Sequence, residues 1–172
     1  CNIGATNVTR VVGKWWGKLC FLLDFLKGAI PVSAALLCSS GEDPLGILPA
    51  VTAFLVVAGH IWPVYLKFKG GKGVATAAGA FLPLSWAALV TALLVWVLVF
   101  LTSRYVSLAS ISAAAVFAIA AIVFYILFPN MGLVPGIKIG QACLVPIILL
   151  SVLTIIKHKS NIVRLLNGTE NR

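Results

Sequence analysis

The sequence predicts an all-α polytopic membrane protein, and two observations carry that prediction. Of its 172 residues, 61% are hydrophobic and only 10% are charged, whereas about a quarter of the residues in a water-soluble domain carry a charge. The apolar residues are gathered in long runs, several of which approach the ~20 residues that a helix needs to cross a bilayer. We therefore expect one integral membrane domain over residues 1–172, built from helices that span or partly span the bilayer.

The first half of the chain contains two apolar runs of this kind. Residues 15–38 are long enough to span, and residues 45–60 form a shorter second run after a turn at residues 39–44. Asp24 and Lys27 lie in the first run at positions i and i+3, so their side chains share one helix face and can pair. We favour a structural role for this intramembrane pair over direct contact with a substrate.

Residues 74–101 are apolar but contain Pro83, and they allow one long helix or two shorter ones. Charge decides between these, because membrane proteins keep their Lys- and Arg-rich loops in the cytoplasm. Only two crossings, with a turn near Pro83, place Arg104 and the basic C-terminal segment on the same side as the earlier basic segments. The first crossing is then far shorter than the ~30 Å apolar core at 1.5 Å per residue. It must be tilted or re-entrant and shielded by protein.

The last third of the chain adds two further runs, residues 105–128 and 139–156, joined by an outer loop over residues 129–138. About six spanning or partly spanning helices result. Residues 157–168 have the pattern of a short amphipathic helix at the membrane surface, ended by Gly168. The polar turns and the C-terminus are then cytoplasmic, and the acidic turn with Glu42 and Asp43 lies on the opposite side.

The segment Asn2-Ile-Gly-Ala-Thr-Asn-Val-Thr-Arg10 combines small polar side chains with one arginine, directly before the first apolar run. Backbone N–H groups and short side chains of this kind can surround a phosphate, and an arginine can bind it with two hydrogen bonds. The alternative is a solvated leader in which Asn7 or Thr9 caps a helix. Because the chain begins inside this segment and without Met, we expect that a preceding part is missing.

The predicted topology brings all the polar segments to one side of the membrane, where we expect them to form one site. Several cations and small polar groups with almost no carboxylates indicate an anionic ligand that carries phosphate. The candidate residues are Asn2, Gly4, Thr6, Asn7, Arg10, Lys69, Gly70, Gly71, Lys72, Gly73, Arg104, Ser107, His158 and Asn161.

Several other functions are excluded by the sequence. The net charge of +9 does not indicate nucleic acid, because the cations lie between apolar runs. Residues 66–73 resemble a P-loop, but Leu66 replaces its first glycine and Gly73 replaces its Ser or Thr. Neither histidine precedes an acid by four or five residues, and no Gly-x-Ser-x-Gly motif is present. Four acidic residues and four scattered cysteines predict no metal site, and we expect no cofactor.

The two histidines differ in their surroundings. A histidine in so apolar a chain is more often a packing or hydrogen-bonding residue, and we favour that role for His60, between Gly59 and Trp62. His158 lies among Lys, Asn and Arg residues, and on a helix it would share a polar face with Asn161 and Arg164. We therefore favour His158 as a functional residue.

Four motifs together carry a resemblance. Residues 2–10 (NIGATNVTR), residues 59–76 (GHIWPVYLKFKGGKGVAT), residues 107–110 (SLAS) and residues 158–164 (HKSNIVR) resemble the bacterial acyl-phosphate:glycerol-3-phosphate acyltransferases, the PlsY family. The resemblance implies a seven-helix inner-membrane enzyme, of which this chain would lack the first helix. It also implies transfer of a fatty acyl group from acyl phosphate to the 1-hydroxyl of glycerol 3-phosphate, giving lysophosphatidic acid. A soluble partner enzyme would supply the acyl phosphate.

The resemblance also assigns roles within the site. Residues 2–7 would hold the acyl-phosphate group, and residues 70–73 would shape the floor of the pocket. Arg10, Lys69, Ser107, His158 and Asn161 would bind glycerol phosphate, and of these we expect His158 and Ser107 to be the catalytic residues. Either His158 or the phosphate of the substrate could serve as the base. The main alternative function is transport of organic phosphates, but a transporter usually shows internal repeats and polar groups at mid-membrane, and neither is visible.

Overall fold

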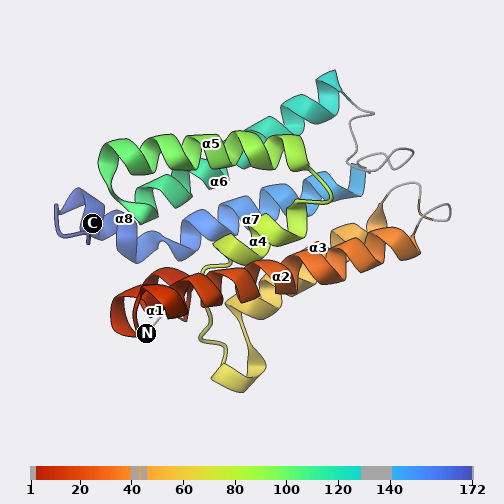
Figure 1. Ribbon diagram of the computed structural model, residues 1–172. Coiled ribbons are helices and arrows are strands. Elements are labelled where there is room, and N and C mark those ends of the chain that lie inside the picture. The colour runs from red at the N-terminus through yellow and green to blue at the C-terminus, as the bar shows by residue number, and fades with distance from the viewer. Residues whose placement is uncertain (1–2, 40–42, 44–45, 129–140, 172) are drawn as a thin grey trace.

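The computed structural model describes residues 3–39, 43, 46–128 and 141–171, and within these ranges it contains helices and no strand. The α-helices are α1 (Ala5–Val11), α2 (Lys14–Cys38), α3 (Ile47–Ile61), α4 (Val74–Phe81), α5 (Trp86–Ser103), α6 (Val106–Leu127), α7 (Leu144–Lys157) and α8 (Lys159–Leu166). Short 3-10 turns occupy Val64–Leu66 and Gln141–Cys143. The long helices lie side by side along one direction, as Figure 1 shows.

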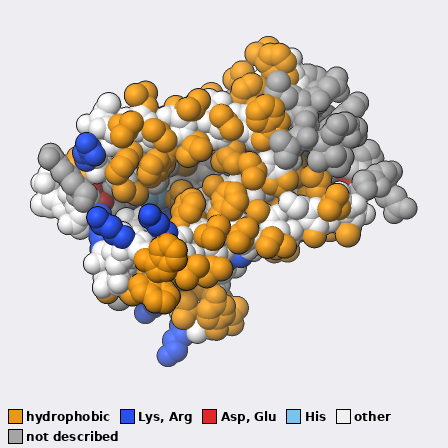
Figure 2. Space-filling view, viewed as in Figure 1, with side chains coloured by type: hydrophobic (Ala, Val, Ile, Leu, Met, Phe, Trp, Pro, Cys, Tyr) orange, Lys and Arg blue, Asp and Glu red, His pale blue; other side chains and the backbone are white. Residues whose placement is uncertain are grey.

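The polytopic membrane character is confirmed. Within the described ranges, the stretches Lys14–Cys38, Ile47–Leu66, Trp86–Ser103 and Val106–Leu127 are each long and apolar enough to cross a bilayer. Helices α7 and α8, which meet at an angle of 50°, make a fifth such stretch when taken together. Hydrophobic side chains cover most of the face seen in Figure 2, as expected of a surface in contact with lipid.

The predicted break near Pro83 is confirmed, because α4 ends at Phe81 and α5 begins at Trp86. Proline has no N–H group to continue a helix, and the N–H groups of Leu84 and Ser85 instead turn back to the carbonyl of Phe81. Helix α4 has 8 residues, or about 12 Å at the usual rise, which is much less than the ~30 Å apolar core.

Protein surrounds this short helix, as its length requires. Helix α4 packs closely on α2 through two glycines. A Cβ atom at Gly28 would lie 2.2 Å from the carbonyl oxygen of Thr76, and one at Gly79 would lie 2.0 Å from that of Phe25. The Phe81 ring of α4 packs in a tilted arrangement against Phe117 of α6, with ring centroids 5.4 Å apart. Close helix approach through small residues is typical of membrane proteins.

The polar segments gather at one end of the bundle, as the sequence predicted. Figure 1 shows α1, α8 and both chain ends there, together with the turn between α5 and α6. Figure 2 shows Lys and Arg side chains at this end and on the projecting loop after α3. The expected outer loop over residues 129–138, Glu42, and most of the turn over residues 39–44 lie outside the described residues.

Candidate active site

The carboxylate of Glu170 lies at the centre of the polar end. Its oxygen Oε1 accepts hydrogen bonds from Ser107 Oγ at 2.9 Å and Asn161 Nδ2 at 2.7 Å, and its Oε2 accepts from Arg164 Nε at 2.6 Å. Only 3% of the Glu170 side chain is exposed. Burial alone would raise the pKa of Glu170, but the hydrogen bonds from Asn161, Arg164 and Ser107 lower it below the ordinary value. Glu170 is therefore an anion that holds α6, α8 and the C-terminal tail together.

The turn after α8 brings Glu170 to this place. The helix ends at Leu166, and Gly168 adopts a φ of 68°, a conformation that glycine reaches without strain. The N–H of Thr169 then returns to the carbonyl of Arg164 at 2.8 Å. This closing pattern is typical of helix C-termini, and it reverses the chain so that residue 170 faces the helix it has just left.

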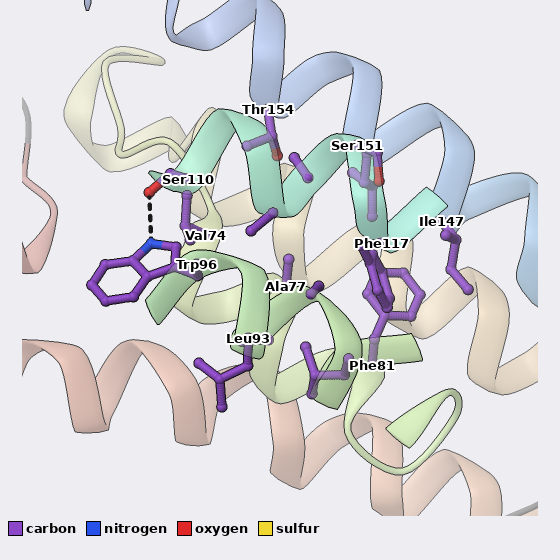
Figure 3. Close-up of a pocket in the computed structure, with 16 residues that line it drawn as sticks. Val74, Ala77, Phe81, Leu93, Trp96, Ser110, Phe117, Ile147, Ser151 and Thr154 are labelled. Atoms are coloured by element: carbon purple, nitrogen blue, oxygen red, sulfur yellow. Dashed lines mark hydrogen bonds between the residues drawn. The ribbon is translucent and has the colours of Figure 1, made fainter. Parts of the chain in front are cut away.

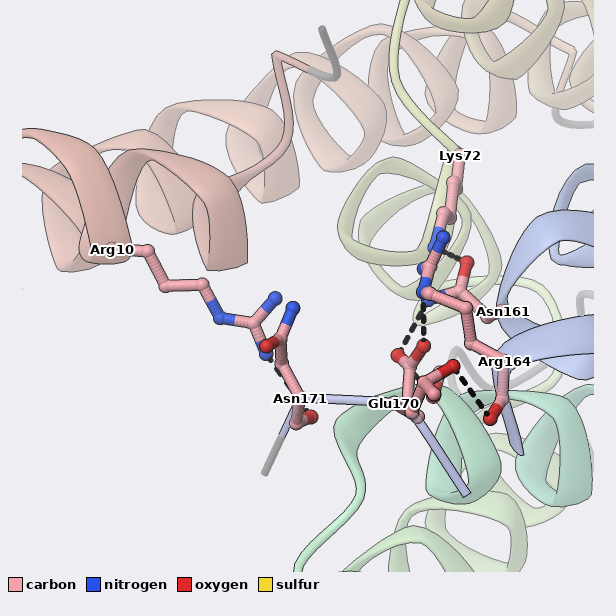
Figure 4. A network of polar contacts seen from close by, with 8 residues as sticks. Arg10, Lys72, Asn161, Arg164, Glu170 and Asn171 are labelled. Atoms are coloured by element: carbon pink, nitrogen blue, oxygen red, sulfur yellow. Dashed lines mark hydrogen bonds and ion pairs between the residues drawn. The ribbon is translucent and has the colours of Figure 1, made fainter. Parts of the chain in front are cut away.

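Lys72 joins the network through Asn161. Its Nζ donates to Asn161 Oδ1 at 2.5 Å, so both ends of the Asn161 amide are used. Burial lowers the pKa of Lys72 to about 8; the charge of Glu170 opposes this, and the charges of Arg164 and Arg10 add to it. Figure 4 shows Lys72, Arg164 and Glu170 together, with Arg10 approaching from the other side through Asn171. Lys72 and Arg164 thus lie around one carboxylate with Arg10 nearby, and the site retains an excess of positive charge that can attract an anion.

The N-terminal segment is helical rather than a phosphate loop. Helix α1 begins at Ala5, and Gly4 is its N-cap. The alternative in which Asn7 or Thr9 caps a helix is wrong, because both residues lie inside α1 and Thr9 Oγ1 donates to the carbonyl of Ala5. Arg10, in the last turn, extends to the tail, where its Nη2 lies 3.3 Å from the carbonyl oxygen of Asn171.

The glycine-rich segment packs on the end of α3. The N–H of Gly70 donates to the carbonyl of Ile61, and the N–H of Gly71 donates to the carbonyl of His60, each at 3.2 Å. The last carbonyls of a helix have no partners within the helix, so this segment satisfies them. Its amide groups at Gly70 and Gly71 are therefore used within the protein, and Lys72, next along the segment, contacts Asn161.

His158 lies between α7 and α8, just beyond the last residue of α7. It is buried, and its Nδ1 donates to the carbonyl of Thr154 at 2.7 Å. Burial, and next the charge of Lys72, lower the pKa of His158 to about 4. At neutral pH the ring is therefore uncharged, with its proton on Nδ1 and an acceptor at Nε2. His158 does not share one uninterrupted helix face with Asn161, because the bend between α7 and α8 separates them.

The predicted site residues divide into those that the structure brings together and those that it does not. Lys72, Ser107, Asn161 and Arg10 belong to the network or contact the tail that carries it. Lys69, Thr6 and Arg104 are exposed, and their side chains lie outside the Glu170 network among the described residues. Asn2 lies outside the described residues.

Glu170 is the central residue of this network and was missed by the sequence analysis, and Arg164 was seen only as part of a polar face. The scarcity of acidic residues could have indicated Glu170. The chain has only four acidic residues and a net charge of +9, and a carboxylate in such a chain is stabilised beside a cation. Asp24 and Lys27 were expected to pair from their i, i+3 spacing, and they do, at 2.5 Å. His60 has the expected structural surroundings, with its Nδ1 at 2.6 Å from Lys27 Nζ.

An apolar pocket begins directly beside the polar network and runs between α4, α5, α6 and α7. Val74 follows Gly73, Ser110 lies one helical turn from Ser107, and Thr154 accepts the hydrogen bond of His158. Figure 3 shows Val74, Trp96 and Ser110 at one side of the pocket and Phe81, Phe117 and Ile147 at the other. The pocket, of about 110 Å³, is lined by Val74, Ala77, Ala78, Phe81, Leu89, Ala92, Leu93, Trp96, Ser110, Ala113, Ala114, Phe117, Ile147, Leu150, Ser151 and Thr154.

The central position of Glu170 generates a prediction. Glu170→Gln keeps the size of the side chain but removes the charge that the cations face, and we expect it to lower the stability of the protein by about 1–3 kcal/mol at neutral pH. Because the pKa of Glu170 is lowered in the folded state, its contribution is present above the ordinary glutamate pKa. It is lost as the pH falls through the folded-state value.

The measurement is unfolding of the purified protein in detergent at several pH values. Thr169→Ala, which changes the exposed neighbouring residue, is the control and should have little effect. Wild type and Glu170→Gln should converge at low pH. Equal stability of Glu170→Gln and Thr169→Ala at neutral pH would contradict the central position of this carboxylate.

Comparison with known proteins agrees with this geometry. The profile of a family described as glycerol-3-phosphate acyltransferase matches residues 1–168. A glycerol-3-phosphate acyltransferase of Syntrophotalea carbinolica is 46% identical over 172 residues, which cover 99% of this chain and 79% of the relative. That of Aquifex aeolicus is 45% identical over 173 residues, covering 99% of this chain and 81% of the relative.

Two solved structures are similar along the same length. Both are crystal structures of PlsY (YgiH), an integral membrane glycerol 3-phosphate acyltransferase, and both are 41% identical to this chain and cover 99% of it. The glycerol 3-phosphate form has a TM-score of 0.81 with 78% of its chain covered, and the lysophosphatidic acid form has 0.80 with 79% covered. With nearly its whole length matched in sequence and fold, this chain belongs to the glycerol-3-phosphate acyltransferase family.

Proposed function

We propose that this protein transfers a fatty acyl group from acyl phosphate to the 1-hydroxyl of glycerol 3-phosphate, releasing lysophosphatidic acid and inorganic phosphate. One observation carries the proposal: the positively charged site around Lys72 and Arg164 lies next to an apolar pocket. The lining of this pocket includes Val74, Ser110 and Thr154, which are close along the chain to Lys72, Ser107 and His158. Both substrates carry a phosphate group, and one of them also carries a long apolar chain. The membership of the chain in its family supports the same activity.

The positive charges serve to bring two anions together. Glycerol 3-phosphate and acyl phosphate repel each other, and cations that face both phosphates offset that repulsion in a partly dry site. Lys72 still carries its proton at neutral pH, because burial lowers its pKa only to about 8, and a bound phosphate would stabilise the protonated form. Orientation of the hydroxyl toward the acyl carbon then lowers the barrier further.

The reaction itself needs little from the protein beyond binding. The oxygen of the glycerol hydroxyl attacks the acyl carbon, the bond from that carbon to the phosphate oxygen breaks, and inorganic phosphate leaves. The hydroxyl proton passes to His158 Nε2 or to a phosphate oxygen of the substrates. His158 has its proton on Nδ1 and an acceptor at Nε2, and anionic substrates beside it would raise its low pKa.

Ser107 would contact the glycerol hydroxyl rather than a phosphate. Its hydroxyl group donates to Glu170 Oε1 at 2.9 Å, so its remaining hydrogen-bonding capacity is as an acceptor. A phosphate dianion offers only acceptors, whereas a glycerol hydroxyl can donate. Because the Ser107 hydroxyl proton is used in the hydrogen bond to Glu170, the Ser107 oxygen can only accept a further hydrogen bond. Its partner in the substrate must therefore be a donor, such as the glycerol hydroxyl.

The test is an assay of purified protein with labelled acyl phosphate and glycerol 3-phosphate. Lys72→Ala should lower kcat/KM for glycerol 3-phosphate by more than about tenfold, because a charge-assisted hydrogen bond contributes roughly 1.5–3 kcal/mol. In the wild type, kcat/KM should fall as the pH rises above about 8, because unliganded Lys72 then loses its proton. Lys72→Arg stays charged and should not show this fall.

Lys14→Ala is the matched control, because Lys14 is exposed at the start of α2, and it should change the rate little. Absence of labelled lysophosphatidic acid from the wild-type reaction would refute the proposed function. Transport of glycerol 3-phosphate into proteoliposomes without acylation would instead support the transporter alternative, which the similarity to acyltransferases does not favour.

The apolar pocket would receive the part of the acyl chain next to the reacting carbon. Its residues continue for about two helical turns from the polar network, which corresponds to about 10 Å, and it excludes water from one side of the site. Its volume of about 110 Å³ is somewhat smaller than an engineered cavity of about 150 Å³ that holds benzene. It therefore holds a segment of a long acyl chain and not the whole chain, and the remainder would extend into the bilayer.

Filling this pocket should reduce the use of long acyl chains. Ala114 lines the pocket, whereas Ala115, on the same helix, is not among its lining residues. We expect Ala114→Phe to lower kcat/KM for a long-chain acyl phosphate by more than about tenfold. For a very short acyl chain, which makes fewer contacts with the pocket, kcat/KM should fall less. Ala115→Phe is the control of equal size. If Ala114→Phe and Ala115→Phe change kcat/KM by the same factor, for long-chain as for short-chain acyl phosphates, the acyl chain binds elsewhere.

We place the site at the cytoplasmic side of a bacterial inner membrane, where a soluble enzyme could deliver acyl phosphate. The support is the Lys and Arg side chains seen in Figure 2 at the end that carries α1, α8 and the α5–α6 turn in Figure 1. We define this soluble enzyme only by its product, a fatty acyl phosphate.

The orientation can be tested with single cysteines at Ser103 and Lys159 in a background without native cysteines. We expect an impermeant thiol reagent to leave both unlabelled in intact cells and to label them after the membrane is opened. A cysteine introduced at Asp43, near the other end of the bundle, is the positive control. Labelling of the first two positions from outside would reverse the proposed orientation.

A further inference from the structure

A partly buried ionic cluster lies next to the glycine-rich segment, and the proposed reaction does not use it; its Lys27 side chain is 41% exposed. Lys27 Nζ lies 2.5 Å from Asp24 Oδ1 and 2.6 Å from His60 Nδ1, and Asp24 Oδ1 lies 3.5 Å from His60 Nδ1. The His60 side chain is 3% exposed, and that of Asp24 is 12% exposed. Because an ammonium group only donates, Nδ1 of His60 accepts from Lys27, and a neutral ring then carries its proton on Nε2.

The opposite edge of the His60 ring touches the glycine-rich segment. A Cβ atom built on Gly71 would lie 2.1 Å from His60 Nε2, and its next nearest neighbours are also atoms of that ring. The backbone dihedral φ of Gly71 is not in the left-handed region, in contrast to that of Gly73 at 80°. The His60 ring is therefore the closest obstacle to a larger residue at position 71, and it sets how closely the segment approaches α3.

We infer that Asp24, Lys27 and His60 form a positioning cluster that fixes Gly71 and thereby the neighbouring Lys72. Asp24 and Lys27, both on α2, hold the ring of His60 on α3 in one orientation. The ring lies against Gly71, and the hydrogen bonds from Gly70 and Gly71 to the carbonyls of Ile61 and His60 attach the segment to the end of α3. Lys72 then points to Asn161, where the proposed function needs a cation.

A general contribution to stability would not require this cluster. An ionic group inside a membrane protein is costly unless it is paired, and an apolar contact between α2 and α3 would hold the helices equally well. Here Asp24 and Lys27 contact the Nδ1 side of the His60 ring, and the other edge of that ring lies against Gly71, the residue before Lys72. This inference rests on the proposed function, since the site that Lys72 serves is the phosphate site of glycerol 3-phosphate.

The experiment is a double-mutant cycle between Gly71 and His60. Gly71→Ala forces its new methyl group against the ring and should displace Lys72. We expect KM for glycerol 3-phosphate to rise by at least about tenfold, with kcat and KM for acyl phosphate changed much less. His60→Ala removes the obstacle, so Gly71→Ala in a His60→Ala background should raise KM by less than about threefold. Gly59→Ala is the control, because a Cβ there meets no atom within 4 Å.

A second variant keeps the test decisive if His60→Ala does not fold. Asp24→Asn removes the charge that holds Lys27, and it should raise KM for glycerol 3-phosphate while leaving KM for acyl phosphate unchanged. The inference is overturned if Gly71→Ala behaves like Gly59→Ala. It is also overturned if His60→Ala fails to relieve Gly71→Ala, or if Asp24→Asn alters both KM values equally. If the wild-type protein shows no acyl transfer to glycerol 3-phosphate, the proposed function is refuted, and not this inference.

Discussion

The arrangement of the polar end depends on one buried carboxylate. Glu170 accepts hydrogen bonds from Ser107 on α6 and from Asn161 and Arg164 on α8. Through Asn161 it also reaches Lys72, in the segment before α4. Elements far apart in the sequence thus meet at one negative charge among cations. A site for two phosphates needs positive charge, and this carboxylate allows the cations to be held close together in the absence of substrate.

The membrane imposes the second constraint, because it separates the polar and apolar requirements of the chemistry. The long helices present hydrophobic side chains to lipid, and their polar connections gather at one end (Figures 1 and 2). Helix α4 is too short to cross, and the close packing at Gly28 and Gly79 shields it. Its first residue, Val74, begins the wall of the apolar pocket directly after Gly73. The same short helix therefore joins the polar site to the pocket for an apolar chain.

The helices and the end of the bundle that carries the site could be predicted, because hydropathy and charge are expressed locally along the chain. The break at Pro83 followed from the need to place Arg104 and the tail on one side. The position of Glu170 could not be predicted, since it depends on the reversal at Gly168 and on three partners from two helices. Nor could the sequence separate Lys72 from Lys69, because the choice depends on how residues 70 and 71 bond to α3. The helical start of α1 at Ala5 was hidden by the polar, glycine-containing composition of that segment.

The most direct test of the account is the position of the phosphate group of glycerol 3-phosphate in a structure of its complex with this protein. The account predicts that phosphate oxygens lie within hydrogen-bond distance of Lys72 Nζ and the Arg10 guanidinium. The glycerol hydroxyl should lie near Ser107 and His158, at the entrance of the apolar pocket. A phosphate bound away from both Lys72 and Arg10, with the Lys72–Asn161–Glu170 contacts unchanged, would contradict it.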